Sequence, residues 1–134
     1  MTEFVDNLVT YPALSIVAPH GENIAKGLKK LEIRKWKPEQ LPLKNVMIIE
    51  NKNYLLQEND QELGYAVALV DFVSVHAWQE NEIEIACASY WAAGYYAWKI
   101  ENVRAIEPFP MIAKRKIYDV ELLAQQIIFK SFDF

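Results

Sequence analysis

The stretch GLKKLEIRKW, residues 27–36, decides the fold of this protein. Residues 22–26 before it can form a short helix, and a glycine directly after a helix suits the left-handed conformation that ends one. From Lys30 onward apolar and polar residues alternate, which is typical of a strand with one buried face. Leu31 and Ile33 share one face of that strand. The other face carries Lys30, Glu32, Arg34 and Trp36.

Apolar runs elsewhere predict the remaining strands, at residues 14–17, 46–49, 65–76, 95–103 and 117–120. Residues 81–93 have apolar side chains at helical spacing before Gly94, and residues 121–130 predict a closing helix. Pro108 and Pro110 predict a turn, and residues 51–62 predict an exposed loop. Five or six strands with two or three helices, without regular alternation, predict an α+β fold around a small mixed barrel.

Length and composition indicate one domain over residues 1–134, with its core at about 11–120 and the closing helix at 121–130. Apolar residues make up 52% of the chain, so a core can form without a disulfide or a structural metal. Neither a metal site nor a cofactor is predicted. The start of the chain lacks the pattern of a secretory signal, and the apolar stretch at 66–75 is interrupted by Asp71, so no membrane span and a cytoplasmic location are expected.

Charge is distributed unevenly along the chain. The net charge is −4, yet residues 26–44 hold seven of the fourteen basic residues, opposed there only by Glu32 and Glu39. A local basic patch on an acidic protein can select a polyanion by position. A solvated charged hairpin is the alternative interpretation of the same pattern.

Residues 27–34 also carry a motif, G-x-K-x-x-E-x-R, with LSIVAP at 14–19 before it and VDFV at 70–73 and YAWKIENVR at 96–104 after it. This order resembles the ASCH domain, a branch of the PUA-like superfamily, from Leu14 to Val120. The resemblance implies a PUA-like β-barrel with a cleft lined by the motif, and binding of RNA or nucleotides. It also implies hydrolase or nuclease activity in some members. Many relatives have arginine and glutamine where this chain has Val17 and Ala18, which removes two polar groups from the expected cleft.

The leading hypothesis is that this domain binds RNA or a small nucleotide-like ligand. Lys29 and Arg34 would contact phosphate or a base edge, Glu32 would accept from an exocyclic amine, and Trp36 would stack on a base. The full predicted binding set is Lys26, Lys29, Lys30, Glu32, Arg34, Lys35 and Trp36. Two structural alternatives stay open: Glu32 and Arg34 as an ion pair that closes a barrel strand, and Trp36 as a cover for the barrel end.

A second hypothesis is a metal-free hydrolase of a modified nucleoside or of RNA, with Lys29 and Glu32 as catalytic residues. A lysine among other cations can act as a base or nucleophile near neutral pH. The ASCH-like subgroup that resembles acetylcytidine amidohydrolases pairs the motif lysine with a threonine three residues on, where this chain has Glu32. Glu80 and Glu82 are further candidate carboxylates. A third hypothesis is a protein-interaction module that uses the aromatic and acidic surface.

Other conspicuous residues have structural interpretations. His20 and His76 are expected in loops or caps, although each could act as a general acid or base. Asp71 in an apolar strand requires a structural partner. The residues expected in the core are Cys87, Tyr96 and Trp98.

Overall fold

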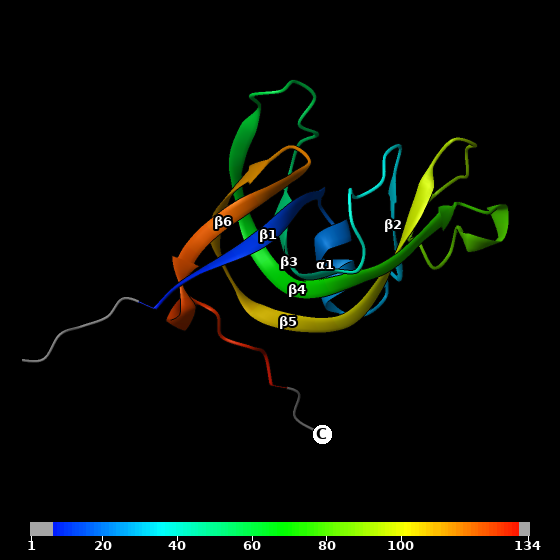
Figure 1. The fold of residues 1–134 in the computed structure, drawn as a ribbon. Coiled ribbons are helices and arrows are strands. Elements are labelled where there is room, and N and C mark those ends of the chain that lie inside the picture. Colours follow the sequence, from blue (N-terminus) through cyan, green and yellow to red (C-terminus); the bar gives the residue numbers. More distant parts are fainter. Residues whose placement is uncertain (1–6, 132–134) are drawn as a thin grey trace, which may run out of the picture.

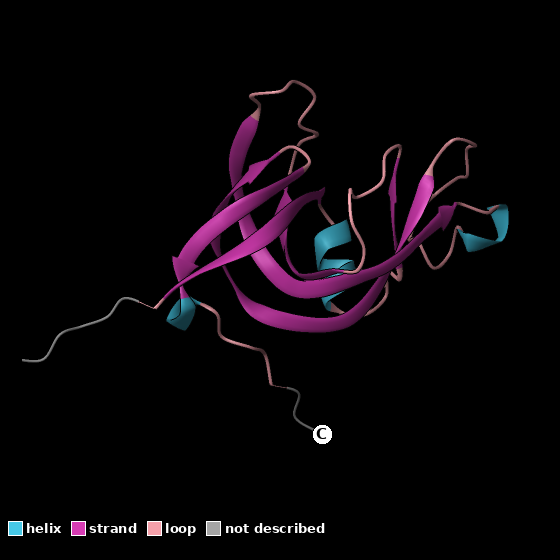
Figure 2. Cartoon of the chain, viewed as in Figure 1, coloured by secondary structure: helices cyan, strands magenta, loops and turns pink. Residues whose placement is uncertain are grey.

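The computed structural model describes residues 7–131 and consists mainly of β-strands. Six strands form one sheet with the order β2-β5-β4-β3-β1-β6. The strands are β1 (Leu8–Val17), β2 (Leu31–Arg34), β3 (Leu43–Asn51), β4 (Gln61–Ala77), β5 (Tyr96–Lys114) and β6 (Ile117–Leu123). One α-helix, α1 (His20–Ala25), and two single 3₁₀ turns, η1 (Glu80–Glu82) and η2 (Ala124–Gln126), complete the elements of the described chain (Figure 2).

The sheet curls into a half-barrel around α1 (Figure 1). β4 and β5 are 17 and 19 residues long and pair antiparallel along almost their whole length. Three register shifts interrupt that ladder, and such bulges let long strands bend. β1 is parallel to β3 and antiparallel to β6, so the sheet is mixed.

Two large apolar clusters lie along the curled sheet. The first gathers Leu14, Phe72 and Trp98 with Ile24 of α1, and all four are fully buried. The second lies under β6 and includes Met47, Ile106 and Leu122. The first cluster fixes the helix inside the curl, which places its first residues beside the end of β1. Within the described residues, no helix is long and apolar enough to cross a membrane.

Several sequence-based predictions are confirmed. The runs at 14–17, 46–49, 65–76 and 117–120 all lie in strands, and the predicted strand at 95–103 lies in β5 apart from its first residue. Gly27 has φ +76°, the positive angle expected after α1. Leu31 packs in an apolar cluster, while Glu32 and Arg34 lie together on the other face of β2.

The expected number of helices is wrong, and residues 81–93 explain half of the error. They contain the last two residues of η1 followed by turns, and Cys87 has φ +55°, which a continuing α-helix cannot contain. Their apolar side chains nevertheless serve a core, because Ile83, Ala86 and Trp91 pack with Trp78 in a small cluster. The apolar residues of 81–93 therefore have helical spacing although they lie in a loop that packs on Trp78.

The closing helix at 121–130 and the turn at the two prolines are also wrong. Residues 121–123 extend β6, where Leu122 is buried opposite Val9 of β1. Up to residue 131, the single turn η2 and an isolated β-bridge at Phe129 follow. Pro108 and Pro110 lie inside β5. β2 pairs only with residues 96–99 of β5, so β5 has no β2 partner at Pro108 and Pro110. Proline is tolerated on such an unpaired strand edge, because no neighbouring strand requires its missing N–H.

Candidate functional site

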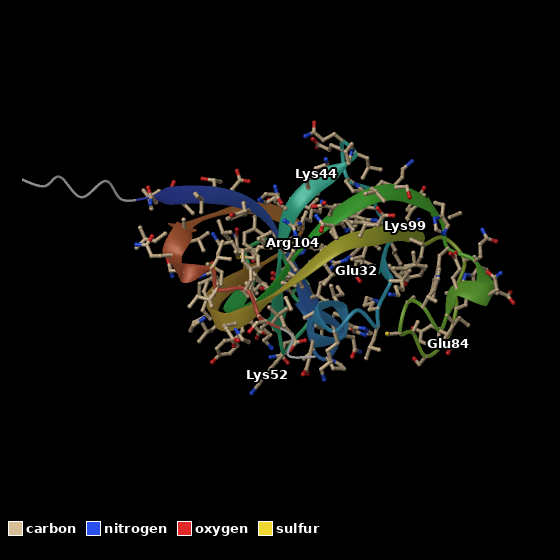
Figure 3. All side chains as sticks on the ribbon, turned by 90° about the horizontal axis from the view of Figure 1, so that it is seen from below. Glu32, Lys44, Lys52, Glu84, Lys99 and Arg104 are labelled. Atoms are coloured by element: carbon tan, nitrogen blue, oxygen red, sulfur yellow. The ribbon has the colours of Figure 1, made fainter. Side chains whose placement is uncertain are left out.

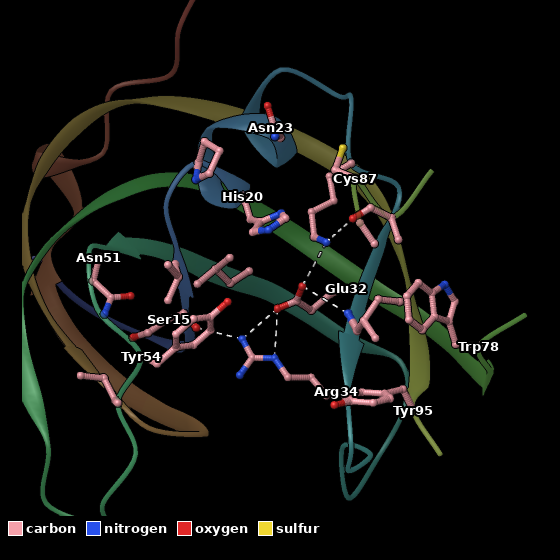
Figure 4. Close-up of a pocket in the computed structure, with 18 of the residues that line it drawn as sticks. Ser15, His20, Asn23, Glu32, Arg34, Asn51, Tyr54, Trp78, Cys87 and Tyr95 are labelled. Atoms are coloured by element: carbon pink, nitrogen blue, oxygen red, sulfur yellow. Dashed lines mark hydrogen bonds and ion pairs between the residues drawn. The ribbon is translucent and has the colours of Figure 1, made fainter. Parts of the chain in front are cut away.

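A cavity of about 910 Å³ opens between the end of β1, α1, β2 and three connecting segments (Figure 4). The segments are the β3–β4 loop, the stretch after η1, and the β5–β6 turn. Residues far apart in the sequence therefore share one wall. Three residues of the predicted motif, Lys29, Glu32 and Arg34, line this cavity.

The route of the chain after α1 turns Lys29 into this cavity. Asn23 O accepts hydrogen bonds from the backbone N–H groups of Leu28 and Lys29 after the positive-φ residue Gly27. The lysine side chain is only 4% exposed. Its Nζ donates to the carbonyl oxygen of Ala86 at 2.5 Å, which also ties it to the stretch after η1.

Lys29, Glu32 and Arg34 form one linked group at the base of the cavity (Figure 4). Lys29 Nζ lies 3.5 Å from Glu32 Oε1. Arg34 donates to Glu32 Oε2 from Nε at 3.0 Å and from Nη2 at 2.8 Å. Nη2 also donates to the carbonyl oxygen of Ser15 at 2.9 Å. The ion pair proposed as the structural alternative is therefore present, and it lines the cavity as well.

Glu32 is 5% exposed, and its charge depends on these partners. Burial opposes ionisation, but the charges of Arg34 and Lys29 and the hydrogen bonds from Arg34 act more strongly, so the pKa of Glu32 lies below its usual value. A buried carboxylate held in this way positions the two cations.

His20 begins α1 and contributes a ring to the same wall (Figure 4). Burial, and next the charge of Lys29, lower the pKa of His20, while Glu32 and Glu50 oppose that shift. Its buried Nδ1 finds no hydrogen-bond partner among residues 7–131. A neutral imidazole with a free ring nitrogen can donate to or accept from a ligand, a role beyond the loop or cap position expected from the sequence.

The predicted binding residues divide into two groups. The cavity wall includes Lys29, Glu32, Arg34 and Trp36. The wall does not include Lys26, Lys30 or Lys35, which are all exposed. Lys26 pairs with Glu22 at 3.1 Å, and Lys35 Nζ lies 5.3 Å from the ring centre of Tyr95.

Trp36 is also engaged within the fold. Its ring meets Trp98 edge to face, with 4.9 Å between the ring centres, and its carbonyl oxygen accepts from Trp98 Nε1. This packing matches the alternative in which Trp36 covers the end of the barrel.

Two exposed tyrosines on the cavity wall were not singled out from the sequence. Tyr54 in the β3–β4 loop is 74% exposed, and Tyr90 after η1 is 72% exposed. The loop that carries Tyr54 is fixed by Glu62, whose carboxylate accepts from the backbone N–H of Asn53 and of Lys52 and from the side chains of Asn51 and Asn53. The hydrogen bonds from Asn53, and then from Asn51, lower the pKa of Glu62 to about 2.

Other residues considered from the sequence have structural partners. Asp71 pairs with Arg104 at 2.9 Å and accepts from Asn102 and from the N–H of Asn45, as expected. His76 pairs with Glu82 at 2.9 Å, and neither Glu80 nor Glu82 reaches the cavity wall. Trp98 is a core residue, whereas Cys87 is half-buried and lines the cavity, so the core prediction for Cys87 is wrong.

Metal binding gains no support from the arrangement of side chains. In the part of the chain that the structure describes, no three His, Cys, Asp or Glu residues gather in a way that could hold a metal ion. The titratable side chains on the cavity wall are those of lysine, arginine, glutamate, histidine, tyrosine and cysteine residues.

A mixed, curled sheet carries the G-x-K-x-x-E-x-R motif beside the cavity, and comparison with protein families agrees with the resemblance to the PUA-like class. A family model described as ASCH domain matches residues 14–110. The chain belongs to the ASCH domain family of the PUA-like superfamily. A comparison with curated proteins found no match.

Proposed function

We propose that the protein binds RNA or a nucleotide-like ligand in this cavity. The observation that carries the proposal is electrostatic. The lining contains five cationic side chains and one carboxylate, a formal charge of +4 on a protein whose net charge is −4. A concave site of one sign attracts an anionic ligand, and the acidic remainder of the surface repels it. The five cations are Lys29, Arg34, Lys114, Arg115 and Lys116.

The linked group at the base of the cavity supplies specific polar contacts. Within residues 7–131, the hydrogen bonds of the Arg34 guanidinium use Nε and Nη2, so the donors on Nη1 remain for a ligand. Both oxygens of Glu32 already have partners, so Glu32 mainly orients the two cations and has limited capacity to accept from a base amine. His20 Nδ1 adds a polar contact beside them.

In this proposal the ligand base stacks on Tyr54 or Tyr90 rather than on Trp36. Tyr54 and Tyr90 lie on different segments of the cavity wall and expose their rings. An exposed ring at a cationic site offers a surface for a base, worth about 1–3 kcal/mol per stacked base. Trp36 uses its ring to pack on Trp98.

Fluorescence anisotropy with a short single-stranded RNA of mixed sequence, at low and at physiological salt, tests this function. Tyr54→Ala should weaken binding about tenfold without loss of stability, because the side chain is exposed and the lost stacking equals about one decade. Arg34→Gln should also weaken binding and reduce the salt dependence.

Two controls separate the cavity from the remaining basic surface. Lys44→Ala removes an exposed cation near the start of β3 (labelled in Figure 3), which does not line the cavity, and should leave affinity unchanged. Lys30→Ala combined with Lys35→Ala removes two exposed cations beside the cavity. A larger loss in this double variant than in Tyr54→Ala and Arg34→Gln would assign binding to the outer patch and contradict the cavity. Absence of RNA binding at low salt would contradict the polynucleotide form of the proposal.

A metal-free hydrolase is the second candidate, favoured by one juxtaposition. The unpartnered Nδ1 of His20 lies in the same wall as the buried pair of Lys29 and Glu32. For an acylated nucleoside, His20 could take a proton from water as the water oxygen adds to the acyl carbon, and Lys29 could stabilise the oxyanion. Breaking the C–N bond would return the proton to the leaving amine.

Incubation of the protein with N4-acetylcytidine and with unstructured RNA, with and without a chelator, tests the hydrolase. Activity that survives chelation and is lost in Lys29→Ala would support it. Activity retained in Lys29→Ala, or lost on chelation, would contradict it. The exposed-lysine variant Lys44→Ala is the matched control and should keep full activity.

A further inference from the structure

Three consecutive cations at the β5–β6 turn form a second charged group in the cavity wall, which the motif does not include. Lys114 ends β5, Arg115 and Lys116 form the turn, and all three line the cavity. Lys114 and Lys116 are exposed, whereas Arg115 is half-buried. No salt bridge engages any of the three within residues 7–131. Their charges are therefore available to a ligand.

Ser15 connects this turn to the motif group. The carbonyl oxygen of Ser15 accepts from Arg34 Nη2 at 2.9 Å, and its Oγ accepts from the backbone N–H of Lys114 at 3.1 Å. Tyr118 of β6 also bonds Ser15 Oγ, at 3.0 Å, and donates to the carbonyl of Ile112. A single residue of β1 thus touches both charged groups, so the turn and the motif are held at a fixed separation.

The two groups differ in what they can offer an anion. The motif cations are committed to Glu32, and that group as a whole carries one net positive charge. Residues 114–116 contribute three positive charges to the cavity lining and include no carboxylate. A phosphate keeps part of its hydration at an exposed rim and gains charge-assisted hydrogen bonds there, with a guanidinium able to bind two of its oxygens at once.

The geometry points to the turn at Lys114, Arg115 and Lys116 as the subsite for the phosphate group of a nucleotide. The base lies toward Arg34 and His20. The inference rests on the proposed function and makes it more specific: the ligand is a phosphorylated nucleotide, whether free or within RNA, rather than an uncharged nucleoside. The motif reads the base edge, and the turn supplies the phosphate affinity.

Isothermal titration calorimetry of the four ribonucleosides and their four 5′-monophosphates tests this assignment at low salt. The wild-type protein should bind at least one 5′-monophosphate about tenfold more tightly than the corresponding nucleoside. Arg115→Gln combined with Lys116→Gln should reduce that ratio to about twofold or less, because monophosphate binding loses its charge-assisted hydrogen bonds. Lys44→Gln is the matched control and should preserve the ratio.

A second variant tests whether the effect of the double variant comes from lost charge or from a changed conformation of the β5–β6 turn. Lys114→Gln changes only the exposed side chain of the last residue of β5, and it should lower the ratio about threefold with an unchanged circular dichroism spectrum. Equal affinity for nucleoside and monophosphate, or a ratio retained in the double variant, would overturn the phosphate subsite while the proposed function stands. Binding of RNA without binding of any mononucleotide would overturn it as well. Absence of binding by every one of these ligands, RNA included, would overturn the proposed function and the subsite together.

Discussion

Replacing Glu32 with glutamine removes the one negative charge of the cavity and keeps the shape of the side chain. In the native protein its carboxylate is 5% exposed and separates two cations, Lys29 and Arg34. Lys29 is itself buried, so the substitution leaves its ammonium without a counter-charge in a poorly solvated position. Breaking a buried ion pair from one side typically costs 3–5 kcal/mol.

The glutamine oxygen can still accept a hydrogen bond, so we expect the lower end of that range, about 3 kcal/mol. For a domain of this size, such a loss lowers the melting temperature by about 10 °C. Urea unfolding at neutral pH measures the free energy of unfolding directly, and a thermal scan gives the melting temperature.

The native pKa of Glu32 lies below its usual value, so its carboxylate stabilises the fold above the unfolded-state pKa near 4.5. This contribution is lost as the pH falls through the lower folded-state pKa. Glu32→Gln should lack this acid-sensitive component.

Glu101→Gln is the matched control, because Glu101 pairs with Lys99 at 3.4 Å on the surface, where its side chain is 49% exposed. This change should cost less than about 1 kcal/mol. Adding Lys29→Met to Glu32→Gln removes the orphaned charge, so the double variant should be more stable than the sum of the single effects by about 1 kcal/mol or more. A Glu32→Gln protein as stable as the Glu101→Gln control would refute the argument that the buried pair organises the site.

Three further predictions concern the parts around this pair. Gly27→Val should destabilise the protein by about 1–3 kcal/mol in urea unfolding because φ is +76°, whereas Gly27→Asn, which tolerates that angle, should cost clearly less; equal effects would exclude backbone strain as the cause. His20 has a lowered pKa, so the unfolded chain binds its proton first and stability should fall as the pH drops below about 6.5; His20→Gln should flatten that decline, and an unchanged pH profile would contradict it. Glu62→Gln should speed amide hydrogen exchange at Lys52 and Asn53, because its carboxylate accepts both N–H groups at 2.8 Å; unchanged exchange would show that the loop is ordered by other contacts.

The sequence predicted the motif region well because the determinants there are local. A positive φ at Gly27 and the opposite facing of Leu31 and Glu32 in β2 depend on neighbouring residues, and both are confirmed. The expectation of one buried face is wrong, because Leu31 and Glu32 are both buried. The long strands predicted at 65–76 and 95–103 were also predictable, since their apolar runs are too short for a membrane span and too β-branched and aromatic for a surface helix.

The two wrong helices have a tertiary cause. Val120 and Leu122 are buried with a period of two because β6 pairs with β1 more than a hundred residues away in the chain. The short window at 121–130 fits a helical period equally well, and only that pairing decides between them. At 81–93 the apolar residues pack on Trp78 without helical hydrogen bonding beyond single turns.

The rest of the cavity could not be predicted because no local pattern marks it. Tyr54, Tyr90 and the turn at residues 114–116 belong to three separate connections that the curled sheet brings to one opening. Each is an ordinary loop residue in sequence. Spatial convergence, rather than spacing along the chain, distinguishes them from the exposed Lys26, Lys30 and Lys35 of the basic run.

Mapping backbone amide shifts by NMR during titration with single-stranded RNA and with the four 5′-monophosphates tests the central claim most directly. The account predicts that the largest shifts fall on the cavity wall, at Ser15, Arg34, Tyr90 and residues 114–116, with Lys44 at the far end of β3 unaffected. Shifts confined to the outer surface around Lys26, Lys30 and Lys35, or the absence of any shift at low salt, would contradict binding in the cavity.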